Sequence, residues 1–345
     1  MKKLSLLILI LVCALNSCSL FTPKPPKSYV LTLVFNKDTI EEYVVEERSH
    51  YTLPEAEIEN DTFYSWIYAS GQTASQDFTM PSSDCILYAI GENAPEKFFN
   101  FNVENSSLTS GSWNALTSKG VLVLPEKFLN CPILKIENEA FYNFSRNLSA
   151  VSIPEGIEII GDNAFAENYY LHSVSLPSTL KHIGNKAFYS SRIEGDLVIP
   201  EGVTYLGEEC FGVNTNLRSI IIPDTVQYIG RGLFENCWGL DQVVLPKGMK
   251  SIPDGMFFDC RNLKVDFLNG IESIGQSAFG YLETNKLVIP LSVQSIGAYA
   301  FEHASISSFE YEGTMDEWSN IELGQFWNVS TNFSEVKCSD GSIPL

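Results

Sequence analysis

The stretch Gly161-Asp-Asn-Ala-Phe165 decides the fold, because versions of it return along the chain every 22 or 23 residues. A glycine opens each version, or a proline in one case, and a phenylalanine closes it. The further copies are Gly184-Asn-Lys-Ala-Phe188, Gly207-Glu-Glu-Cys-Phe211, Gly230-Arg-Gly-Leu-Phe234, Pro253-Asp-Gly-Met-Phe257, Gly275-Gln-Ser-Ala-Phe279 and Gly297-Ala-Tyr-Ala-Phe301, with an imperfect first copy at Ala140-Phe141. Such a period indicates a solenoid of stacked coils, in which no coil can bury its apolar side alone.

Two short strands are predicted in each repeat, with a proline after the first. The first strand ends at Val151-Ser-Ile-Pro154 and recurs in each later repeat, including Val265-Asp-Phe-Leu268. Proline has no amide hydrogen to donate to the next coil, so it closes the strand. The second strand places Ile157 and Ile160 three residues apart, facing the core. The glycine that follows is expected to supply a turn that other residues rarely adopt, although Pro253 requires a negative φ there.

The chain is therefore predicted to be mainly β, with a solenoid of 22–23-residue coils over residues 101–313. Alternating apolar residues predict a small β-domain over residues 29–91, joined to the solenoid by a linker up to residue 100. Residues 101–132 are an atypical opening that is expected to cover the apolar edge of the first coil. Residues 314–345 are predicted to form a C-terminal cap, in which Thr314-Met-Asp-Glu317 is a capping box for one short helix.

Two rows of outward side chains are candidate binding surfaces. On the second strand, His182, Tyr205 and Tyr228 occupy one position in successive coils. On the first strand, the equivalent outward positions hold the aliphatic residues Val198, Ile221 and Val244. Exposed aromatic or apolar side chains in a continuous row often mark an interaction site. The same residues also stabilise a sheet simply by stacking as ladders, so the pattern leaves both roles open.

Neither catalysis nor a metal or cofactor is expected. The four histidines, His50, His172, His182 and His303, are far apart in sequence and have no recurring nucleophilic or acidic partner. A Ser/His/Asp set could be assembled only from common residues on a repetitive surface. The chain lacks a phosphate-binding glycine loop and a calcium-loop pattern of alternating oxygen ligands.

Charge and cysteine content exclude further classes of function. Lysine and arginine number 22 against 42 aspartates and glutamates, and loss of Lys2 and Lys3 with a leader would leave 20 against 42, a net charge of −22. A nucleic acid would be repelled by such a surface. The cysteines form no Cys-x-x-Cys pair, which argues against a zinc site. Cys237 and Cys260 occupy the same position in neighbouring repeats and are predicted to be buried free thiols.

The N-terminus predicts an exported and anchored protein. Lys2 and Lys3 precede an apolar run from Leu4 to Leu15 that is too short to span a bilayer, which is typical of a signal peptide over residues 1–17. The junction Leu15-Asn-Ser-Cys18 resembles the lipobox of bacterial lipoproteins. That resemblance implies that Cys18 is acylated and becomes the first mature residue. Residues 18–28 are rich in proline and are expected to act as a tether.

Two family resemblances extend this interpretation. The spacing of aromatic and proline residues from Tyr29 to Ala89 resembles the internalin-type B-repeat, a small β-domain of bacterial surface proteins. The recurring Ile-Pro, Ile-Gly and Ala-Phe pairs from Phe101 onward resemble those of BspA-like leucine-rich-repeat surface proteins. That second resemblance implies an exported protein that adheres to host matrix proteins or to other cells.

The resulting hypothesis is a lipid-anchored protein of the bacterial cell envelope, exposed at the surface, whose solenoid binds a protein or glycan without catalysis. The candidate residues are Cys18 for lipidation and the two outward rows for binding. The alternative is a structural envelope component that has no specific ligand. An enzyme would require a catalytic group that assembles across coils.

Overall fold

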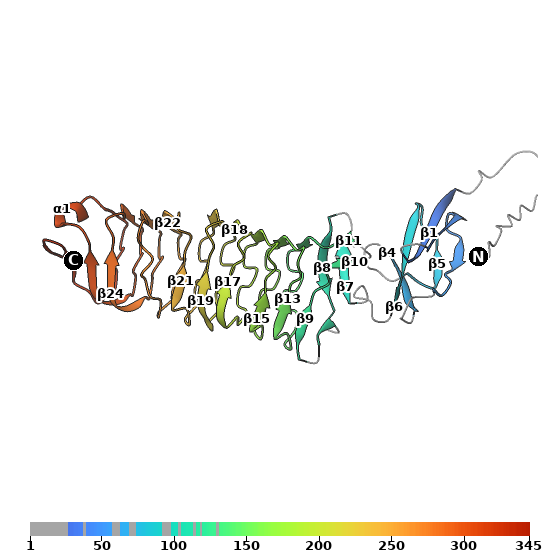
Figure 1. The fold of residues 1–345 in the computed structure, drawn as a ribbon, viewed down its shortest axis with the longest axis horizontal. Helices are drawn as coiled ribbons and strands as arrows, with labels where there is room; N and C mark the ends of the chain where they lie inside the picture. The colour runs from blue at the N-terminus through green and yellow to red at the C-terminus, as the bar shows by residue number, and fades with distance from the viewer. Residues whose placement is uncertain are drawn as a thin grey trace, which may run out of the picture.

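The computed structural model describes residues 27–36, 39–56, 63–68, 74–91, 98–102, 105–112, 115–117, 119–128 and 131–345. The predicted signal peptide, Cys18 and the tether up to residue 26 lie outside this set. Figure 1 shows a long rod of stacked coils with a small sheet at its N-terminal end. The prediction of a mainly β chain with a repeat solenoid is confirmed, since strands make up nearly all of the regular structure.

The N-terminal β-domain contains six strands around a core of its own. They are β1 (Ser28–Asn36), β2 (Thr39–Glu46), β3 (His50–Thr52), β4 (Phe63–Tyr68), β5 (Asp77–Thr79) and β6 (Cys85–Gly91). One sheet has the order β2-β1-β6-β4, in which β1 runs parallel to β6, and β3 pairs with β5 in a second sheet. Leu31, Leu33 and Leu87 are fully buried, and Trp66 and Phe78 complete the core.

An irregular segment covers the first regular coil. Its strands are β7 (Phe99–Asn102), β8 (Ser107–Gly111), β9 (Val121–Val123), β10 (Lys127–Phe128) and β11 (Cys131–Pro132). Strand β8 pairs in parallel with β12 (Lys135–Ile136) of the first coil, and Phe101 stacks on Phe128 with ring centroids 4.8 Å apart. Phe99 is only 5% exposed. The solenoid core therefore begins inside the segment expected to be a linker, two residues before residue 101.

The first strands of the coils form three short parallel stacks. They are β13 (Ala150–Ser152), β15 (Ser173–Ser175), β17 (Gly195–Val198), β19 (Leu217–Ile221), β21 (Gln242–Val244), β24 (Glu283–Ile289) and β26 (Ser305–Tyr311). The sheets are β15-β13-β9, β17-β19-β21 and one that contains β24 and β26. The strand predicted at Val265–Leu268 is absent from this described segment. There the ring of Phe267 packs against Phe257, with centroids 5.4 Å apart, and the chain does not extend alongside β21.

The second strands form two longer stacks. They are β14 (Ile159–Ile160), β16 (His182–Ile183), β18 (Tyr205–Leu206), β20 (Tyr228–Ile229), β22 (Ser251–Ile252), β23 (Ser273–Ile274), β25 (Ser295–Ile296) and β27 (Glu322–Leu323). One sheet has the order β20-β18-β16-β14-β12-β8-β7, and the other has the order β22-β23-β25-β27. The ladder is thus interrupted between β20 and β22, where the sequence predicted a continuous row.

The glycines that open the repeats do not have the predicted role. In the described coils none of them has a positive φ. A Cβ atom on Gly207 would instead lie 2.4 Å from the amide nitrogen of Asn185, and one on Gly230 would lie 2.4 Å from that of Glu208. Glycine is required because the backbones of adjacent coils approach too closely for a side chain.

Residues with a positive φ, in the left-handed region, lie two and six positions after the residue that opens each repeat. In one coil φ is 53° at Asn163 and 60° at Glu167, and the same two positions are left-handed in every later coil up to Tyr299 and His303. The amide of Asn163 donates to the carbonyl oxygen of Asn185 at 2.8 Å, and such bonds recur along the rod. The turns are therefore joined from coil to coil by the backbone, as the strands are.

A column of phenylalanine rings runs along the core. The closing phenylalanine of each repeat is fully or almost fully buried, as predicted, from Phe141 to Phe301. Successive ring centroids lie 5.2 to 6.3 Å apart. The planes of neighbouring rings differ by 2–7° from Phe141 to Phe211, by 17–20° from Phe211 to Phe279, and by 6° at the last pair. The rings are therefore less parallel in the middle of the column than at its two ends.

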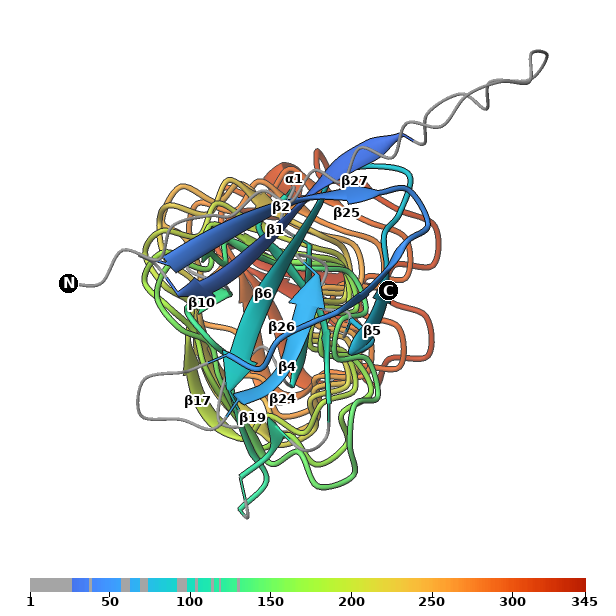
Figure 2. The ribbon, with the colours of Figure 1, turned by 90° about the vertical axis from the view of Figure 1, so that its right-hand side faces the viewer.

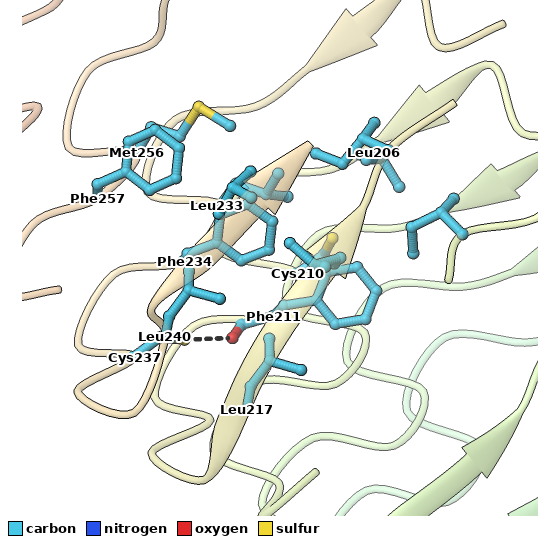
Figure 3. Packing of buried hydrophobic residues seen from close by; sticks show 14 of the residues in the cluster. Leu206, Cys210, Phe211, Leu217, Leu233, Phe234, Cys237, Leu240, Met256 and Phe257 are labelled. Atoms are coloured by element: carbon cyan, nitrogen blue, oxygen red, sulfur yellow. Dashed lines mark hydrogen bonds between the residues drawn. The ribbon is translucent and has the colours of Figure 1, made fainter. Parts of the chain in front are cut away.

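Buried cysteines of the middle coils lie beside this column, and Figure 3 shows two of them, Cys210 and Cys237. Cys237 and Cys260 are fully buried and free, which confirms the prediction of stacked thiols. The thiol of Cys237 donates to the carbonyl oxygen of Phe211 at 3.2 Å, and that of Cys260 donates to Phe234 at 3.1 Å. In two earlier coils Asn168 and Asn214 take the equivalent position, and their side-chain amides donate to the carbonyl oxygens of Phe141 and Phe188.

The C-terminal end of the solenoid is closed by a short helix and a hairpin. Helix α1 (Met315–Trp318) begins after Thr314, and both hydrogen bonds of the predicted capping box to Glu317 are present. Strands β28 (Glu335–Cys338) and β29 (Gly341–Pro344) pair antiparallel and continue the sheet of β26. Trp318 and Trp327 are almost fully buried, and Trp327 packs edge-on against Phe301 at 6.1 Å. These rings cover the last member of the phenylalanine column.

Candidate functional site

Three aromatic side chains form a stacked row on the second-strand sheet. His182 pairs in register with Tyr205, and Tyr205 with Tyr228, on strands β16, β18 and β20. The imidazole lies 4.2 Å from the ring of Tyr205 with an interplanar angle of 7°, and the two tyrosine rings are 4.7 Å apart at 10°. His182 and Tyr205 are half-buried, whereas Tyr228 is 45% exposed. We call this set the aromatic row.

Burial within the aromatic row affects the ionisation of its members. Desolvation lowers the pKa of His182 from its ordinary value, and this effect outweighs the opposing charge of Asp162. The pKa of Tyr205 is raised, first by burial and then by Tyr228. Both shifts favour the uncharged forms of His182 and Tyr205. The row presents flat aromatic surface with polar edges.

The aliphatic candidates form a second row on the first-strand sheet. Val198, Ile221 and Val244 are in register on strands β17, β19 and β21. All three are exposed, by 60%, 44% and 55%. We call them the aliphatic row. Figures 1 and 2 place the two sets of strands on different sides of the rod, so the two rows do not form one surface.

The histidines do not converge on a shared site in the described part of the chain. His303 stacks on Tyr281 with ring centroids 4.9 Å apart. His172 lies 3.7 Å from a carboxylate oxygen of Glu194. Among the described residues, no group of three or more His, Cys, Asp or Glu side chains is placed to hold a metal ion.

A groove that sequence reasoning missed adjoins the exposed end of the aromatic row. It has a volume of about 450 Å³ and lies between the coil of β20 and that of β22. Its walls include Val226, Ile229, Met249 and Ser251. The available signal was Pro253, which replaces the opening glycine in this coil alone. From the sequence, the replacement of glycine by Pro253 indicated only that φ is negative at this position.

Comparison with protein families identifies the repeat. The sequence model of the BspA-type leucine-rich-repeat region matches residues 134–264 and 264–342 in six copies. These matches cover more than half of the chain. The chain belongs to the BspA-type leucine-rich-repeat family. Proteins built from leucine-rich repeats are generally binding scaffolds rather than enzymes.

Solved structures of bacterial leucine-rich-repeat proteins resemble this chain. A leucine-rich-repeat protein of T. pallidum is 29% identical, with a TM-score of 0.48, over 55% of this chain and 88% of its own. A leucine-rich-repeat protein of Bacteroides ovatus is 23% identical, with a TM-score of 0.49, over 66% of this chain and 65% of its own. A leucine-rich cell surface protein of Faecalibacterium prausnitzii is 18% identical, with a TM-score of 0.30, over 65% of this chain and 95% of its own. The comparison with curated proteins gave no match.

Within the described ranges, helices of sufficient length and apolar character to cross a bilayer are absent. Cys18, the predicted site of lipidation, lies outside the described residues.

Proposed function

We propose that this chain is a bacterial cell-surface binding protein whose solenoid recognises a protein or glycan ligand without catalysis. Membership of the BspA-type family supports a binding role. The acylated end is proposed to be Cys18, with residues 18–28 as the tether between the membrane and the small β-domain over residues 29–91. The signal peptide over residues 1–17 directs export, and the solenoid is exposed on the cell.

The observation that carries this proposal is the aromatic row. His182, Tyr205 and Tyr228 are held on parallel strands with ring separations of 4.2 and 4.7 Å. Aromatic side chains fixed in this way lose little conformational entropy on binding, and tyrosine adds a hydroxyl to a large apolar area. The aliphatic row offers a second, purely apolar surface at Val198, Ile221 and Val244.

The test is the double variant Tyr205→Ser with Tyr228→Ser. We expect it to weaken retention of the protein on host cells or matrix proteins that bind the parent by roughly 2 kcal/mol or more, because tyrosines at the centre of an interface are frequent hot spots. The measurement is the retained fraction across a concentration series, together with the melting temperature. Tyr169→Ser with Tyr170→Ser is the matched control, because these tyrosines are 47% and 48% exposed outside the row.

The alternative of a structural envelope component makes the opposite prediction. If the aromatic row serves only as a ladder, the double variant loses stability and its retention stays at the parental level. That outcome would remove the aromatic row as the binding surface. The aliphatic row and the N-terminal β-domain would then be the next surfaces to examine by the same method.

A further inference from the structure

The interruption of the second-strand sheet leaves backbone groups without partners. At the preceding junction, the amides of Gln227 and Tyr228 donate to the carbonyl of Thr204, at 2.9 and 3.2 Å, and that of Gly230 donates to Leu206 at 2.9 Å. The equivalent three bonds are absent between β20 and β22, a junction whose residues are all described. The carbonyl groups of Gln227 and Ile229, which correspond to those of Thr204 and Leu206, and the amides of Lys250 and Ser251 are therefore open to a ligand.

Pro253 accounts for this opening in two ways. It has no amide hydrogen, so the bond that Gly230 makes to the previous coil has no counterpart. Its ring also adds side-chain atoms at a position where the equivalent residues, Gly207 and Gly230, have none. A Cβ atom on either glycine would lie 2.4 Å from the backbone of the preceding coil. The opening is confined to the second-strand face, because the turns of the same two coils remain joined by the bond from the Gly232 amide to the Asp254 carbonyl at 2.8 Å. The ladder resumes after the gap, where Gly275 donates to Ile252 at 2.8 Å.

The opening has an apolar floor and a nearly neutral rim. Val226 is almost buried and Ile229 is half-buried, although its counterparts Ile183 and Leu206 are fully buried. Met249 adds a flexible apolar wall. At the rim, Lys247 pairs with Asp224 at 3.3 Å and Lys250 with Glu272 at 2.9 Å. These pairs leave no excess of either charge to select a charged ligand.

We propose that the gap between β20 and β22 binds an extended peptide segment of a partner protein. One aliphatic side chain of the peptide enters the floor formed by Val226, Ile229 and Met249. The peptide groups on either side of it, each with one donor and one acceptor, pair with the open carbonyls of Gln227 and Ile229 and with the amides of Lys250 and Ser251. Tyr228 lies beside the peptide. This inference rests on the proposed binding function and assigns a protein, rather than a glycan, to this groove.

The experiment uses phage-displayed random heptapeptides, selected on the full chain. We expect enriched sequences to share an aliphatic residue and to bind Pro253→Gly roughly tenfold or more weakly, because glycine lets the coils close and restores the amide. Pro154→Gly, a half-buried proline in a distant coil, is the matched control and should bind as the parent does. Met249→Trp fills the groove without changing the backbone and should also abolish binding.

Hydrogen exchange gives a second readout that does not depend on the peptide. The amides of Lys250 and Ser251 should exchange faster than those of Glu272 and Ser273 in the parent, and should become protected in Pro253→Gly or after an enriched peptide binds. Three outcomes would each overturn the inference. The selection yields no enriched peptide, the enriched peptides bind all variants equally, or the amides of Lys250 and Ser251 are already protected in the parent. Retention on cells that is lost in the double tyrosine variant but kept in Pro253→Gly would preserve the proposed function and reject this groove.

Discussion

Val213 occupies a backbone conformation that β-branched residues rarely adopt. Its φ is 58°, and it stands six residues after an opening glycine, where every coil is left-handed. One coil later the same position is Asn236, with φ of 60°. Asparagine tolerates this conformation far better than valine does. The repeat therefore imposes the conformation on Val213 against its local preference.

Exchanging these two residue types should change stability in opposite directions. We expect Val213→Asn to raise the free energy of unfolding by about 1 kcal/mol, because it relieves the strain of a β-branched residue in the left-handed conformation. We expect Asn236→Val to lower the free energy of unfolding by about as much, because it introduces that strain. Equilibrium unfolding in urea measures both. A loss of stability in both variants would show that the side-chain packing of Val213 outweighs its backbone strain.

The thiols of the core are predicted to be inert. Burial raises the pKa of Cys237 to about 12 and that of Cys260 well above its ordinary value. The thiolate is the reactive form, so neither residue should be alkylated at pH 8 in the folded protein, and both should react after denaturation without a reductant. Cys338, which is only half-buried, should react first. Mass spectrometry of the labelled peptides reports each site, and any need for a reductant would reveal a disulfide.

At the scale of the coil, the phenylalanine column couples each element to its neighbours. The ring of Phe211 is fully buried and stacks between Phe188 and Phe234, at 5.7 and 6.3 Å. Removal of one ring therefore affects the packing of three coils.

Phe211→Ala should lower the free energy of unfolding by ~3–5 kcal/mol, because it leaves a cavity in a close-packed core. Since each coil depends on its neighbours, hydrogen exchange should increase in the coils of Phe188 and Phe234 as well. Phe326→Ala is the control, because this phenylalanine is 53% exposed and its loss should cost less than ~1 kcal/mol. A cost for Phe211→Ala that matches the control would contradict this account of the column.

The features predicted correctly from the sequence are those that depend on residues within one repeat. The burial of Phe211 and the capping box at Thr314 follow from local pattern, and both are confirmed. The role of Gly207 was misjudged, because close approach between coils is a distance that periodicity does not contain. The gap at Pro253 was missed for the same reason. The strand expected at Val265–Leu268 is replaced by packing of one phenylalanine on another, which depends on tertiary contacts.

For the candidate site, the repeat spacing predicted that the side chains of the aromatic row are aligned, but it did not predict how exposed each of them is. The register that brings His182, Tyr205 and Tyr228 together follows from their equal spacing, and the strands pair accordingly. The sequence could not distinguish the exposed Tyr228 from the half-buried Tyr205. That difference arises because β20 lies next to the gap, whereas β18 has a strand on each side.

At the scale of the whole molecule, the proposed acylation of Cys18 is what would hold the rod at a membrane. Cys18→Ala should move the protein from the detergent phase to the aqueous phase and abolish labelling with a radioactive fatty acid, because acyl chains supply the membrane affinity. Cys13→Ala is the control and should leave both unchanged. Protease added to intact cells should remove the repeats from the parent. Continued acyl labelling of Cys18→Ala would show that another residue is modified.

The in-register stacking of coils also determines how far the protein extends. Parallel strands in a sheet are spaced by about 4.8 Å, so one additional coil lengthens the rod by that amount and leaves the caps at both ends unchanged. Duplication or loss of a single repeat would thus change the length of the rod in small equal steps without redesign of the core. Chains that differ only in repeat number would present the same two ends at different separations, as rulers of graded length.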